Sequence, residues 1–206
     1  YSDYTWDHLP SLKLTFAGAN TWNGSISTAW NTAANWSTGA VPISSQDVVI
    51  ADVTNQPVIT SAVTVAALTV NSGADITVSS NSLTATGATD CDGTLIVDNA
   101  TVNLDGTANF SNGTINFTHA SGKITLSSSV TSLGALDEAM GTIEYDGAGA
   151  QTILADTYYN LELDGDGSGN KKAGGSVNVN GTFTVGANCQ RYRTQGYTTT
   201  ICLLYT

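Results

Sequence analysis

The stretch Gly113-Thr114-Ile115-Asn116-Phe117 decides the fold class, because the same five-residue unit recurs along the chain. It consists of a glycine, usually a threonine, and a triplet that is apolar, polar and apolar. The glycine permits a corner, and the alternation of an extended strand then turns two apolar side chains to one face and the polar one to the other. Further copies begin at Gly93, Gly106, Gly122, Gly141, Gly175 and Gly181. This repetition predicts many short strands in one repeating architecture.

The spacing of these units predicts how the strands are arranged. Gly93 and Gly113 are 20 residues apart, and Gly122 and Gly141 are 19 apart. A repeat of about 20 residues is typical of solenoids, in which each repeat packs only on its neighbours. We therefore predict an all-β protein, a single-stranded parallel β-helix (β-solenoid) whose windings form one stack. A β-sandwich of two facing antiparallel sheets is the alternative.

Composition supports an all-β fold and excludes several functions. The 206 residues include 31 Thr, 20 Ser, 17 Asn and 21 Gly, but only three Glu and one Met, which suits strands and turns and not helices. The net charge is -11, whereas a nucleic-acid-binding protein needs clustered basic residues. The same negative charge disfavours binding to an anionic membrane surface. No apolar run approaches the roughly 18 residues of a membrane helix. We expect neither nucleic-acid binding nor membrane insertion.

Four segments follow from the pattern. Residues 1–20 hold an isolated strand with one apolar face, residues 21–46 a tryptophan-rich cap, residues 47–187 the solenoid, and residues 188–206 a tail. The tail has both arginines and no acidic residue, and we expect it to replace a further coil. The apolar face of the first strand consists of Leu12, Leu14 and Phe16.

Two stretches resemble a known class of proteins. One runs through Thr21-Trp22-Asn23-Gly24, residues 27–37 (STAWNTAANWS) and Gly39-Ala40-Val41-Pro42. The other includes residues 141–145 (GTIEY) and 177–185 (VNVNGTFTV). They resemble the opening signature and repeating coils of large secreted bacterial surface proteins built from β-solenoid repeats. The resemblance covers roughly residues 21–187. It implies a parallel β-helix on the cell exterior, in adhesins, stalks or filaments, and no catalytic residues.

The cap tryptophans Trp22, Trp30 and Trp36 have two interpretations. With neighbouring asparagines they could stack sugar rings, which would make the chain a glycan-binding adhesin module. Alternatively, the indoles close the open end of the core, as an uncapped coil would expose apolar interior and unpaired backbone. The second interpretation is favoured.

Asp164, Asp166 and Ser168 form a candidate calcium loop, with oxygen ligands at positions 1, 3 and 5 and a glycine at position 6. The twelfth position is Gly175, where a bidentate glutamate should stand, so a glycine-rich turn is the plainer interpretation. Calcium is the only cofactor for which the sequence offers a candidate.

Cysteine spacing gives no zinc site but suggests a disulfide. Cys189 and Cys202 are the preferred pair, with Cys91 left over. The sequence opens without an initiator methionine or an apolar signal core, which suggests a mature exported chain.

An enzyme is not expected. A polysaccharide lyase needs a base and cationic groups that neutralise an enolate, and a hydrolase needs two carboxylates across a sugar. The chain has no arginine before Arg191, and its neighbouring acidic pairs lie in turns. We expect instead an extracellular structural subunit, a homo-oligomer or filament assembled head to tail by strand addition at its ends. The expected assembly residues are Leu12, Leu14, Phe16, Cys189 and Cys202.

Overall fold

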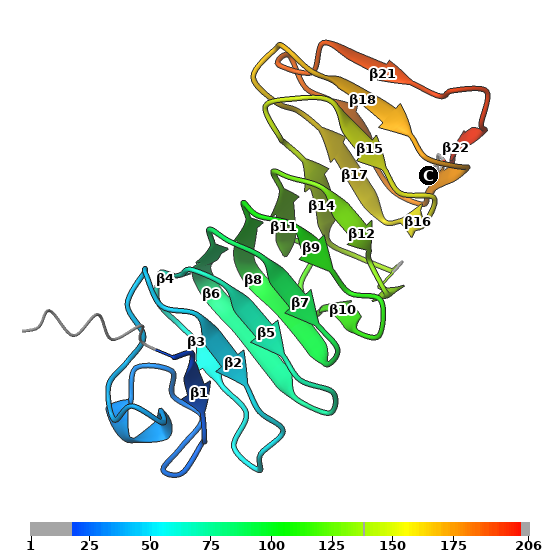
Figure 1. Cartoon of the computed structure of the whole chain (residues 1–206). Helices are drawn as coiled ribbons and strands as arrows, with labels where there is room; N and C mark the ends of the chain where they lie inside the picture. Colours follow the sequence, from blue (N-terminus) through cyan, green and yellow to red (C-terminus); the bar gives the residue numbers. More distant parts are fainter. Residues whose placement is uncertain (1–17, 138, 203–206) are drawn as a thin grey trace, which may run out of the picture.

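The computed structural model describes residues 18–137 and 139–202 (Figure 1). They form an all-β solenoid of about eight turns, in which every ladder of paired strands is parallel. The one helical segment among these residues is a 3-10 turn, η1 (Ala33–Asn35). The predicted β-helix is therefore confirmed, and the β-sandwich alternative is wrong because its ladders would be antiparallel. The predicted strand of Leu12, Leu14 and Phe16 lies outside the described residues.

The coils present three faces, each a stack of parallel strands. The first face is the sheet β1 (Asn20–Trp22), β2 (Val48–Ile50), β5 (Leu68–Val70), β7 (Thr89–Cys91), β9 (Ala108–Asn109) and β12 (Val130–Ser132). The second face stacks β3 (Val58–Ile59), the first half of β6 (Asp75–Ala85), the first half of β8 (Thr94–Leu104), β10 (Thr114–Phe117) and β13 (Ala135–Leu136). The third face stacks β4 (Val63–Val65), the second halves of β6 and β8, β11 (Lys123–Leu126), β14 (Thr142–Tyr145), β17 (Asn160–Leu163) and β20 (Phe183–Val185).

The register confirms the predicted coil length. Thr94 pairs with Thr114 and Lys123 pairs with Thr142, so the two glycine spacings noted in the sequence are true coil-to-coil steps. Along the third face, successive partners of Ile124 are Val102 on one side and Ile143 on the other. Ile124 and Val102 are 0% exposed and Ile143 2%. Each fully buried aliphatic side chain of this stack contributes about 1.5–3 kcal/mol.

One column of corners requires glycine. Gly93, Gly113 and Gly134 precede register partners on the second face. A Cβ at Gly113 would lie 2.2 Å from the carbonyl oxygen of Cys91, and one at Gly134 2.2 Å from that of Gly113. The backbones of successive coils are thus too close at this corner for any side chain.

The first and second faces are interrupted, whereas the third is continuous. No described strand pairs with β12 or β13 on their C-terminal side, and two new sheets begin in the next coil. We call this interruption the seam; it lies between the labels β12 and β16 in Figure 1. The new sheets are β15 (Gln151–Ile153), β18 (Asn170–Ala173) and β21 (Arg191–Arg193), and β16 (Thr157–Tyr158), β19 (Val177–Val179) and β22 (Thr199–Ile201). Among the described strands, only the β11-β14-β17-β20 ladder joins the coils on either side of the seam.

The tail differs from its prediction. It does not replace a coil: β21 pairs with β18, and β22 pairs with β19, so the solenoid continues to Ile201. Tyr192 supplies the inward side chain, with its ring 5.3 Å from that of Phe183 in an edge-to-face contact. None of the described residues forms a helix long and apolar enough to cross a membrane.

Candidate functional site

The last coil, residues 182–202, is the candidate interaction site because its outer edge is open. We call it the C-terminal coil; it comprises β20, β21 and β22, and none of these strands has a described partner beyond it (Figure 1). Val185, Tyr197 and Ile201 are 46%, 48% and 41% exposed there. Unpaired backbone groups beside exposed apolar side chains form a template for another strand.

The same coil is the basic end of an acidic rod. Arg191 and Arg193 point to one face of β21, and Arg193 is paired in register with Lys172 of β18. No ion pair within 4.0 Å involves these three cations in the described part of the chain. By contrast, residues 18–122 carry seven aspartates and no lysine or arginine. Charge is therefore distributed unevenly along the rod: the part near the cap is acidic, and the open end carries basic side chains without ion pairs among the described residues.

The opposite end is closed by the tryptophan cap. The rings of Trp30 and Trp36 lie 4.6 Å apart edge to face, and those of Trp22 and Trp36 lie 5.0 Å apart. The Trp36 indole N–H donates to the carbonyl of Trp30 at 2.8 Å, and that of Trp22 to the carbonyl of Asn55 at 2.7 Å. This confirms the aromatic cap.

The interpretation of the three tryptophans as a sugar-stacking platform is wrong. Trp22 is 0% exposed, and Trp30 and Trp36 are each 2% exposed, so no indole face reaches solvent. Asn35, buried within the cap, fixes the loop around them: its side-chain oxygen accepts from the backbone N–H of Ile26 and Ser27. Sequence reasoning missed this role of Asn35.

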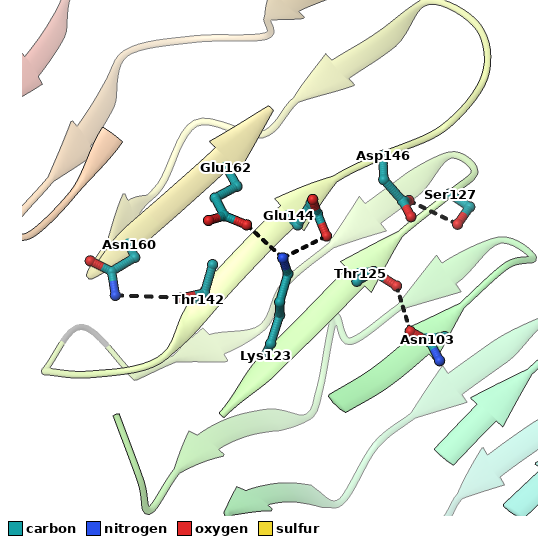
Figure 2. Close-up of polar contacts among 9 residues, drawn as sticks. All are labelled: Asn103, Lys123, Thr125, Ser127, Thr142, Glu144, Asp146, Asn160 and Glu162. Carbon is teal, nitrogen blue, oxygen red and sulfur yellow. Dashed lines mark hydrogen bonds and ion pairs between the residues drawn. The ribbon is translucent and has the colours of Figure 1, made fainter. Parts of the chain in front are cut away.

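A polar ladder runs over the outer surface of the third face (Figure 2). Glu144 and Glu162 are register partners on β14 and β17, so two like charges lie directly opposite each other. Lys123 of β11 reaches both, with its Nζ 2.9 Å from Glu144 and 2.5 Å from Glu162. The lysine therefore offsets a repulsion that the stacking creates.

Neutral pairs extend the ladder on both sides of these charges. Thr125 Oγ1 donates to Asn103 Oδ1 at 3.0 Å, and Asn160 Nδ2 donates to Thr142 Oγ1 at 3.5 Å. The signal that could have revealed the ladder is the separation of 18 residues between the two glutamates, which is one coil.

Removing the Lys123 charge should destabilise the fold by about 1 kcal/mol, because Glu144 and Glu162 would then repel each other. Desolvation lowers the pKa of Lys123, but hydrogen bonds and charge interactions with Glu162 and Glu144 outweigh it and raise the pKa above 10.5. The pKa of this lysine is higher in the folded than in the unfolded chain. Its contribution to stability is therefore complete at pH values below the unfolded-state pKa, and it is lost as the pH rises through the folded-state pKa. The stability difference between wild type and Lys123→Met should therefore be constant near neutrality and shrink above pH 10.5.

Urea unfolding at a series of pH values measures this difference. Lys172→Met, which removes a lysine without an ion pair among the described residues, is the matched control and should lack the effect. A difference that grows at alkaline pH would contradict the assignment.

The candidate calcium loop is only partly assembled. Asp166 Oδ1 accepts from the backbone N–H and hydroxyl of Ser168 at 2.9 and 2.5 Å, and these bonds lower the pKa of Asp166. The Asp164 carboxylate instead lies over Gly186 in the next coil. No group of three or more His, Cys, Asp or Glu residues in the described ranges is placed to hold a metal ion. Calcium binding stays a prediction.

The predicted disulfide is not formed. Cys91, Cys189 and Cys202 are all free. Cys189 is buried in the turn that leads to β21, whereas Cys202 is exposed after β22, where its N–H donates to Val179. Burial raises the pKa of Cys91 to about 12, so this thiol is unreactive.

Comparison with known proteins gives a family but no characterised relative. No curated protein and no solved structure matches the chain. A family model described as "Domain of unknown function (DUF8693)" matches residues 21–138. The match begins within β1 and ends close to the seam. That stretch is more than half of the 206 residues. The chain therefore belongs to the DUF8693 family.

Proposed function

We propose that this protein is a non-enzymatic structural subunit of an extracellular filament or surface appendage, and that copies join head to tail. The observation that carries the proposal is the difference between the two ends of the rod. One end is closed by buried indoles, and the other presents an open, basic and partly apolar coil. The surface location rests on the resemblance to secreted β-solenoid proteins and on a Thr-, Ser- and Asn-rich exterior.

The proposed occupant of the open edge is the segment 12–16 of another copy. Its alternation of Leu12, Leu14 and Phe16 suits a strand with one apolar face, which could cover the exposed apolar side chains of the C-terminal coil. The charge distribution favours the same polarity, because the part of the rod from the cap to residue 122 carries seven aspartates and no lysine or arginine that would repel the neighbour's Arg191 and Arg193.

The partner strand has to come from another molecule. About eight turns at a rise of ~4.8 Å make a rod roughly 35–40 Å long. From residue 18, in the first coil, the chain back to Leu12 spans at most about 20 Å even when fully extended. The segment therefore cannot reach the open edge of its own rod. A contact between unlike ends does not close on itself, so it generates a filament.

The test is deletion of residues 1–18 together with a pair of matched substitutions. The full chain should form thin polymers in negative-stain electron microscopy and sediment as a concentration-dependent series, whereas the deletion should remain monomeric. Ile201→Asp, at the open edge, should also abolish polymers. Thr131→Asp, at an exposed position of β12 away from both ends of the rod, should not. Monomeric full-length protein at high concentration, or polymers unchanged by the deletion, would refute the proposal.

A further inference from the structure

Lys171 is a buried lysine without a carboxylate partner. It lies on β18, points into the solenoid and is 0% exposed. No ion pair within 4.0 Å involves it in the described part of the chain. Its Nζ contacts only two oxygens among those residues, the carbonyl of Gly147 at 2.8 Å and the side-chain Oε1 of Gln151. Burial of an ammonium group without an ion-pair partner is unfavourable, so the site needs a chemical explanation.

Gln151 is the register partner of Lys171 and is itself buried, at 8% exposure. It stands at the seam, where β12 has no described strand partner on its C-terminal side, and its amide bonds across the seam to the segment that precedes β12. Nε2 donates to the carbonyls of Leu126 and Ser128 at 2.7 and 2.9 Å. The backbone N–H of Gly147 donates to Oε1 at 2.8 Å. The amide is thus held rigidly. Its oxygen accepts hydrogen bonds from the Gly147 N–H and from Nζ of Lys171.

Burial makes the lysine easier to deprotonate than a solvent-exposed lysine. Desolvation lowers the pKa of Lys171, and the negative charges of the Asp146, Asp164 and Asp166 carboxylates oppose this only partly. A neutral amine is a nucleophile, whereas an ammonium is not. The same low-polarity interior strengthens any hydrogen bond to charge that develops on Oε1.

We propose that Lys171 and Gln151 join in an intramolecular isopeptide bond that links two successive coils. Nζ of the neutral amine attacks Cδ of Gln151, and the Gly147 N–H stabilises the negative charge that forms on Oε1. The bond between Cδ and Nε2 then breaks. Nε2 leaves as ammonia, taking one proton from Nζ, and Oε1 becomes a carbonyl again. No oxidant, reductant or other reactant is needed.

The product removes the buried charge, while the departure of Nε2 leaves the Leu126 carbonyl with the Asp146 N–H as its donor and takes one donor from the Ser128 carbonyl. The buried amine becomes part of a neutral amide, whose oxygen keeps the Gly147 N–H as donor. The bond also reinforces the pairing of β15 with β18, the first two strands of the sheet that begins after the seam. A cross-link between residues 20 positions apart restricts the unfolded chain as a disulfide of similar span does.

Mass spectrometry of the purified full chain tests the proposal. The intact mass should be lower than the sequence mass by one molecule of ammonia, and digestion should give a branched peptide joining residues 151 and 171. Lys171→Met should have its full sequence mass, because methionine offers no nucleophile while filling similar volume. Lys172→Met, at the neighbouring position that points outward, should keep the loss and the branched peptide.

Two results would overturn the isopeptide bond. One is a folded wild-type chain with its full sequence mass. The other is an ammonia loss that persists in Lys171→Met or that maps to an asparagine, since cyclisation of asparagine also releases ammonia. Neither result depends on polymerisation, so the bond and the proposed filament stand or fall separately.

Discussion

Trp36→Ala should destabilise the protein by about 3–5 kcal/mol, which is the usual cost of removing a large buried aromatic side chain. Trp36 is 2% exposed and packs edge to face against both other cap indoles. Its removal would open a cavity at the end of the core and leave the Trp30 carbonyl without its 2.8 Å donor. Urea unfolding followed by far-UV circular dichroism measures the loss without relying on tryptophan fluorescence.

Ile26→Ala is the matched control for the cap. Ile26 lies in the same loop but is 65% exposed, so its truncation should change the stability by less than about 0.5 kcal/mol. Equal effects of the two substitutions would mean that the indoles do not close the core.

Gly113→Ala should cost about 1–3 kcal/mol although it adds a single methyl group. The new Cβ would lie 2.2 Å from the Cys91 carbonyl oxygen and 3.0 Å from that of Gly93. Both oxygens belong to the backbone of the preceding coil, which cannot move without disturbing the β8–β10 ladder. The midpoint of thermal unfolding, compared with wild type, measures the effect.

Gly149→Ala is the control for the glycine column. No atom lies within 4 Å of a Cβ built there, and its backbone is not left-handed. Because alanine restricts the unfolded chain more than glycine does, this change should be neutral or stabilising by up to about 1 kcal/mol. A stability loss as large as that of Gly113→Ala would show that the column is not sterically special.

The sequence predicted the coil because the determinants of this fold are local. Each glycine corner and the strand after it specify which side chains point inward, and neighbouring coils repeat that pattern at nearly constant spacing. The tail was mispredicted because it lacks the glycine-led unit. Tyr192 nevertheless supplies an inward ring, which is enough to continue the stack.

The candidate site was less accessible from sequence. An open edge is a property of the whole stack, and no single residue marks it. Lys171 and Gln151 were missed because polar residues in a strand are expected to point outward, and only the register shows that both point inward and face each other. Glu144 and Glu162 likewise become neighbours only when the coil length is known.

The seam has a mechanical consequence. Two blocks of coils meet at the seam, close to the end of the DUF8693 match. One continuous sheet connects them, and on the other two sides no described strands pair across the junction. Such a molecule is stiff along most of its length but has one weak joint. In the filament proposed above, pulling or bending would concentrate deformation at these joints, which would let the assembly yield elastically before any block unravels.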